Sequence, residues 1–90
     1  PKPTEGLHRV EHAAYQYCKD ARVLYIGPDH LFLKLVEDEQ IAEILNTIHV
    51  DIADFKKRLQ DHLRIHDQNY HLADGDEPHK SVEYIGLMQR

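Results

Sequence analysis

The feature that most restricts the fold of this chain is a nearly continuous apolar run at residues 31–36, which begins just after Gly27-Pro28-Asp29. Periodicity alone cannot decide whether such a run is a buried strand or a buried helix. Proline is favoured at the first position of a helix, because the N–H that it lacks has no partner there. Asp29 then places a negative charge near the positive end of the helix dipole. The sequence therefore predicts a helix over residues 28–37.

Apolar residues recur at helical spacing in four further segments. Asp51 and Ser81 are good N-cap types and stand just before two of them. The predicted helices cover residues 5–21, 28–37, 39–48, 51–65 and 81–90. The predicted core, taken from their apolar faces, consists of Val10, Ala14, Tyr17, Cys18, Leu31, Leu35, Ile41, Ile44, Leu45, Phe55, Leu59 and Leu63. The fold class that follows is all-α.

The stretch from residue 67 to residue 80 is polar and contains Asp74-Gly75-Asp76-Glu77-Pro78 at its centre. Clusters of Asp, Gly and Pro between periodic segments are typical of loops. We therefore expect an exposed, acidic linker over residues 67–80.

Composition and charge exclude several classes of function. The formal net charge of −5 argues against a protein that tracks nucleic-acid phosphates. No apolar run approaches the roughly 20 residues that a membrane span needs, and residues 1–5 offer no secretory signal. A single cysteine, Cys18, fits a reducing compartment, so a cytoplasmic location is expected. No glycine-rich phosphate loop is present, and we expect no cofactor.

Residues 8–12, His-Arg-Val-Glu-His, match the H-x-x-E-H pattern of some zinc hydrolases. Histidines four apart on a helix can share a metal, and Glu11 could take a proton from bound water. A metal-dependent hydrolase using His8, Glu11 and His12 is thus one alternative. Short motifs match by chance, however, so we expect no metal site and no catalytic residue. Adventitious zinc or nickel is conceivable at His8 and His12, or at the similarly spaced His62 and His66.

Residues 27–38, Gly-Pro-Asp-His-Leu-Phe-Leu-Lys-Leu-Val-Glu-Asp, resemble the T-x-E-H-L-L-L-A-L-L-x-D signature of the Clp N-terminal repeat. Residues 44–63 are similar to the end of that repeat, and residues 81–90 are similar to the first helix of a second copy. The resemblance implies a helical bundle with one four-helix repeat at residues 1–66. An acidic linker at residues 67–80 and the first helix of a second, incomplete repeat at residues 81–90 would follow.

In that family the domain captures protein substrates or adaptor proteins for an AAA+ ring, which unfolds proteins and passes them to a Clp peptidase. The resemblance implies a binding domain of an unfoldase that acts as a chaperone in protein quality control and regulates proteolysis. ATP hydrolysis would lie elsewhere in a parent protein, and this chain would not be an enzyme. The alternative is a stand-alone accessory protein that binds a Clp protease complex.

The resemblance also implies where partners bind. Adaptors in the family grip the seam between repeats, which corresponds here to Glu77, His79, Lys80, Ser81 and Tyr84. Aromatic residues dominate interface hot spots, so Tyr84 is expected near the surface as an anchor, unless it packs inward.

A second candidate face contains Asp29 and Lys34. In one branch of the family a glutamate at the position of Asp29 helps to hold phosphorylated arginine, although the helix dipole alone accounts for an acid there. Lys34 replaces a small residue of the family and is expected to face solvent or a partner. His30 matches the histidine of the repeat, and packing or capping is its expected role.

Overall fold

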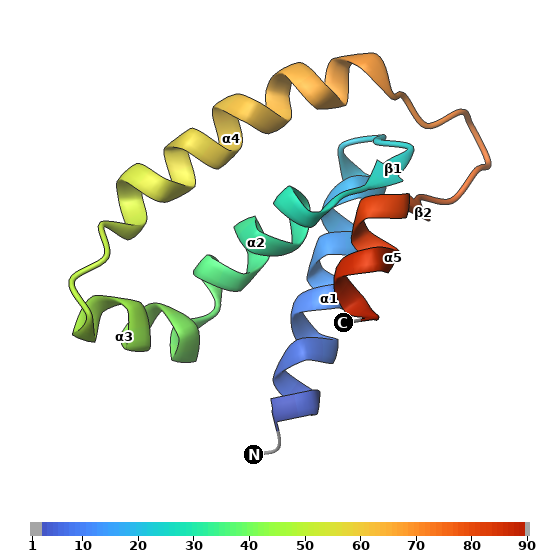
Figure 1. The fold of residues 1–90 in the computed structure, drawn as a ribbon. Coiled ribbons are helices and arrows are strands. Elements are labelled where there is room, and N and C mark those ends of the chain that lie inside the picture. Colours follow the sequence, from blue (N-terminus) through green and yellow to red (C-terminus); the bar gives the residue numbers. More distant parts are fainter. Residues whose placement is uncertain (1–2, 90) are drawn as a thin grey trace.

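The structure is a computed structural model that describes residues 3–89 (Figure 1). In chain order the described elements are α1 (Pro3–Asp20), β1 (Tyr25–Ile26), α2 (Pro28–Glu37), α3 (Glu39–Thr47), α4 (Ile52–Asn69), β2 (His79–Lys80) and α5 (Val82–Met88). The all-α class is confirmed, and residues 28–36 contain no strand. Each predicted helix is present with small shifts of its ends. Arg90, the last residue of the final predicted helix, lies outside the described residues.

The side chains of the N-cap residues set the start of three helices. The carboxylate of Asp51 accepts a hydrogen bond from the Asp54 N–H at 3.1 Å, and the Ser81 hydroxyl accepts one from the Tyr84 N–H at 3.1 Å. Both N-caps were predicted from the sequence. Asp38 separates α2 from α3 and caps α3 through the N–H groups of its second and third residues. These caps satisfy donors that a helix cannot satisfy by itself.

The helices are arranged around α2, which packs against α1, α3 and α4. The last helix, α5, lies beside α1, whereas α3 and the first turns of α4 extend away from both (Figure 1). The strands β1 and β2 pair in parallel, with Tyr25 opposite His79 and Ile26 opposite Lys80. Two-residue strands are too short to leave a period in the sequence, and they were not predicted. Within the described part of the chain, no helix is long and apolar enough to cross a membrane.

The core lies where α1, β1, α2 and α5 meet. Its buried cluster consists of Val10, Ala14, Cys18, Val23, Ile26, Leu31 and Tyr84. Leu33, Val36, Leu63 and Leu72 are also buried. Of the predicted core, Val10, Ala14, Cys18, Leu31 and Leu63 are confirmed as buried. Burial is only partial at Tyr17, Leu35, Ile41, Leu45 and Leu59.

Two predicted core residues are exposed. Ile44 is 59% exposed and Phe55 is 41% exposed, so their assignment to the core is wrong. Ile44 belongs to α3, which has an apolar face but no buried residue, and Phe55 belongs to the first turns of α4, which extend away from α1 and α5 (Figure 1). Periodicity identifies which face of a helix is apolar, but only the tertiary arrangement decides whether another element covers it.

The stretch expected as an exposed linker is partly built into the fold. Residues 67–69 belong to α4, and both Leu72 and Pro78 are buried. Asp74 forms an ion pair with Arg22, and Glu77 lies 3.2 Å from the Nζ of Lys19. These contacts hold the loop against the end of α1. The division of the chain into repeats stays a prediction, since α5 packs into the same core as α1.

Candidate functional site

A pocket of about 530 Å³ lies between the N-terminal ends of α2 and α5 and the last turns of α4. Its lining combines aromatic, apolar and charged side chains from segments far apart in the sequence. The lining residues are Tyr25, Gly27, Pro28, Asp29, His30, Leu63, His66, Tyr70, Lys80, Ser81, Val82 and Glu83. The mixture of a few charged groups with aromatic surface is typical of binding sites.

The structure brings together three of the residues predicted to bind partners. Asp29 comes from the first turn of α2, and Lys80 and Ser81 come from β2 and the N-cap of α5. The parallel pairing of β1 with β2 places these two segments side by side. Glu77 and His79 are exposed but do not line the pocket. Glu77 is engaged with α1, through Lys19 and the hydroxyl of Tyr15.

Tyr84 requires a correction. It is 2% exposed and packs in the core cluster, so the expectation of a surface anchor is wrong. The Ser81 cap starts α5 so that Tyr84, three residues later, faces α1. Burial raises the pKa of Tyr84 to about 12, and the charge of Glu11 adds to this rise. Tyr84 therefore acts as a core residue beneath the pocket wall.

Lys34 lies outside the pocket and is held by an intramolecular pair. Its Nζ is 2.9 Å from Oε1 of Glu37 and 5.0 Å from the ring centroid of Tyr17. The other oxygen of Glu37 is 2.7 Å from the Nζ of Lys56 on α4. Burial raises the pKa of Glu37, but the hydrogen bonds from Lys56 and Lys34 outweigh burial and leave this pKa below its ordinary value. The ion pairs of Glu37 with Lys34 and Lys56 thus link α2 to α4.

His30 is fully buried, and both of its ring nitrogens have partners. The backbone N–H of Gly27 donates to Nδ1 at 2.9 Å, so in the neutral ring the proton must be on Nε2. Nε2 then donates to Oδ1 of Asp67 at 3.0 Å. His30 therefore caps the start of α2 and joins it to the end of α4. The expected role in packing and capping is confirmed.

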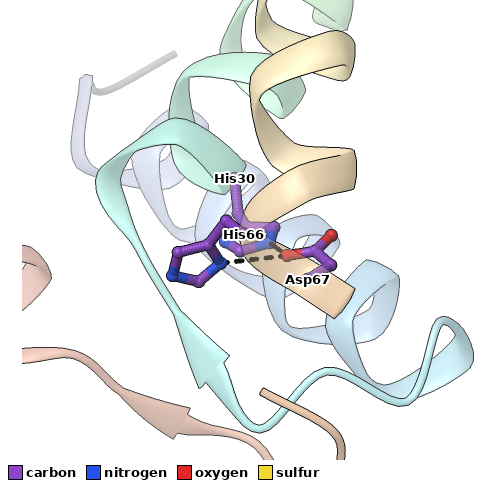
Figure 2. Close-up of side chains that lie close together, drawn as sticks. All are labelled: His30, His66 and Asp67. Carbon is purple, nitrogen blue, oxygen red and sulfur yellow. Dashed lines mark hydrogen bonds and ion pairs between the residues drawn. The ribbon is translucent and has the colours of Figure 1, made fainter. Parts of the chain in front are cut away.

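A second histidine meets the same carboxylate oxygen. Nδ1 of His66 lies 3.1 Å from Oδ1 of Asp67, and Figure 2 shows the two rings converging on this one atom. Burial lowers the pKa of His30, although the negative charge of Asp67 opposes this shift. The ring of His30 is consequently neutral at pH 7. The sequence does not predict that these three side chains meet, because their contact depends on how far α4 extends.

His30, His66 and Asp67 bring three potential metal-ligating atoms within 4.8 Å of one another. A ligating histidine usually donates its other N–H to an acceptor. His30 does the opposite, because its other nitrogen accepts from Gly27. Coordination through Nε2 would move the proton to Nδ1, where it would oppose the Gly27 N–H. The cluster fits a hydrogen-bonded triad better than a metal site.

The histidine pairs noted in the sequence do not converge on one centre. His8 and His12 are exposed on α1, and in the described residues neither belongs to a group of three potential ligands. His62 instead lies with its Nε2 at 3.1 Å from Oδ2 of Asp29. His62 and His66, four residues apart on α4, thus contact two different carboxylates, those of Asp29 and Asp67.

Two tyrosines form an aromatic wall that sequence reasoning missed. The rings of Tyr25 and Tyr70 are 5.5 Å apart at an interplanar angle of 75°, and the ring of His66 is 5.0 Å from that of Tyr70. Tyr25 is 39% exposed and Tyr70 is 43% exposed, so both present ring surface to solvent. Tyr25 is the first residue of β1 and Tyr70 is the C-cap residue of α4, so neither belongs to the periodic pattern of a helix. Only the fold places them together.

Comparison with known proteins agrees with this architecture. Residues 2–89 match the family described as the Clp repeat N-terminal domain. No individual curated protein matches the chain significantly.

Proposed function

Because the chain belongs to the family of Clp repeat N-terminal domains, we propose that it binds protein substrates or adaptor proteins for an ATP-dependent Clp unfoldase. The domain would recruit polypeptides, and an ATPase ring elsewhere in the parent protein would unfold them for a Clp peptidase. In this proposal the chain is a cytoplasmic chaperone module that serves quality control and regulated proteolysis. It needs no cofactor and catalyses no reaction itself.

The observation that carries the proposal is the pocket between α2, α4 and α5. Its wall is formed by the ends of three helices and a strand pair, which hold the binding groups in place. Tyr25 and Tyr70 offer large rings with few rotatable bonds, a residue type that is enriched at interface hot spots. The 83% exposed side chain of Val82 adds apolar surface at the rim.

Charges of both signs surround these rings. Asp29 and Glu83 provide carboxylates, and Lys80 provides an ammonium group. This mixture suits a polypeptide, whose backbone and side chains present donors, acceptors and apolar groups within a short length. It also favours protein partners over nucleic acid, in agreement with the net charge of −5.

The test is a binding titration with a permanently unfolded probe, reduced and carboxymethylated lactalbumin, followed by NMR of the labelled domain. We expect shift changes at Tyr25, Tyr70 and Lys80. The double variant Tyr25→Ala/Tyr70→Ala should bind at least about tenfold more weakly, since hot-spot truncations cost about 2 kcal/mol or more. The control is Ile65→Ala, which removes an exposed apolar side chain outside the pocket. Equal affinity of the double variant and the control would overturn the proposed site.

A further inference from the structure

His30 has no free ring nitrogen. Its Nδ1 accepts from the N–H of Gly27, and its Nε2 faces the Asp67 carboxylate, at 2.9 Å and 3.0 Å respectively. The side chain has no exposed surface, so water cannot replace either partner without movement of the chain. A second proton can therefore bind only at Nδ1, the atom that caps α2.

We propose that His30 and Asp67 form a proton-operated latch, which fastens the start of α2 to the last turns of α4 and opens when His30 becomes doubly protonated. Protonated Nδ1 would be a donor facing another donor, the N–H of Gly27. The cap would be lost, and a charged ring would be left in a buried site. Residues 27–29 are then free to move away from α4.

The surrounding charges determine how readily the latch opens. Asp67 on α4 and Asp29 on α2 favour the charged ring, whereas a charged His66 would oppose it. The ring of Tyr17 on α1 lies 5.8 Å away. Lys80 of β2 and Glu83 of α5 line the same pocket with opposite charges. Burial is the largest influence and keeps the latch closed at neutral pH.

Opening would also change the pocket, because Gly27, Pro28 and Asp29 form part of its wall. The effect of latch opening on partner binding is the only part of this inference that rests on the proposed function. The latch itself is a property of the free domain, and its test uses no ligand.

The test is hydrogen exchange of the Gly27 amide, measured by NMR and corrected for the intrinsic exchange rate. Between about pH 7.5 and about pH 5.5, on either side of the ordinary histidine pKa of about 6.5 that the ring regains in the open state, the protection of Gly27 should fall by at least about threefold relative to amides in the middle of α4. His30→Gln is the matched variant, since glutamine at the third helical position can also accept from the N-cap N–H but does not titrate. It should protect Gly27 equally at both pH values. His62→Gln, which removes an exposed histidine on α4, should behave as the wild type.

A pH-independent protection of Gly27 in the wild type, or a pH dependence that persists in His30→Gln, would overturn the latch. If His30→Gln does not fold, ring-nitrogen chemical shifts of the wild type decide the question. The proposal requires that Nδ1 of His30 is unprotonated near neutral pH and gains its proton only below the ordinary histidine pKa of about 6.5. A proton on Nδ1 near neutral pH would refute it.

Discussion

Arg9 on α1 donates two hydrogen bonds to one carboxylate oxygen of Asp38, which lies at the junction of α2 and α3. Nε and Nη2 of Arg9 lie 3.1 Å and 2.7 Å from Oδ2 of Asp38. The other oxygen, Oδ1, accepts from the N–H groups of Gln40 and Ile41 at 3.1 Å and 3.3 Å. The hydrogen bond from Arg9 is the main cause of the lowered pKa of Asp38, and the two backbone bonds contribute. A single side chain thus caps α3 and binds α1.

The two roles of Asp38 can be separated by substitution. Asp38→Ala removes both the cap and the ion pair and should lower the urea midpoint of unfolding. Asp38→Asn keeps an N-cap type and loses only the charge, so it should retain most of the stability. Equal losses in the two variants would show that the contact with Arg9 matters more than the cap.

Burial of Tyr84 predicts a large effect on stability. Tyr84→Ala should cost about 3–5 kcal/mol in the free energy of unfolding, as expected for truncation of a buried aromatic ring. Tyr84→Phe keeps the ring and should be nearly neutral. Ile85→Ala, which alters a 42% exposed side chain on the same helix, is the control. A loss below about 1 kcal/mol in Tyr84→Ala would contradict the packing of α5 on α1.

Two residues of α4 provide a matched comparison of burial. Leu63 is 2% exposed and Ile65 is 65% exposed. Leu63→Ala should destabilise by about 2–5 kcal/mol, whereas Ile65→Ala should stay within about 0.5 kcal/mol. Urea unfolding measures both. Similar losses in the two variants would mean that a different face of α4 is turned toward α2.

The buried state of His30 predicts how stability depends on pH. Its pKa is lowered in the folded state, mainly by burial, so the unfolded chain binds more protons. The contribution of His30 to the free energy of unfolding is then fully present above the unfolded histidine pKa of about 6.5, and it falls as the pH drops below that value. Glu37 and Asp38, whose pKa values are also lowered, should add a second loss below about pH 4.

Urea midpoints of unfolding should fall in the wild type as the pH drops below about 6.5, and they should fall less in His30→Gln. A midpoint that rises on acidification between about pH 7 and pH 5.5 would contradict the sign of the histidine shift.

The helices were predictable because their signals are local. The Gly-Pro-Asp start of α2 and the caps Asp51 and Ser81 act within one helical turn, and the structure confirms all three. Val23 and Ile26 were missed as core residues, because a short mixed segment between helices has no period to interpret.

The pocket was predictable only in part. Asp29, Lys80 and Ser81 were found through the resemblance to a known family, and they do line it. Tyr25 and Tyr70 were not found, since their contact depends on β1 lying beside the end of α4. Local patterns do not contain that information.

The pairing of β1 with β2 has a consequence for the order of folding. Parallel strands cannot be joined by a tight turn, so this pair can close only around the whole of α2, α3 and α4. The entropy of closing that long segment is lost before the contact contributes any stability. We expect the helices to form and dock first, and β2 and α5 to join last. The wall of the pocket that contains Lys80 would then be the last part to assemble during folding and the first to open in partial unfolding.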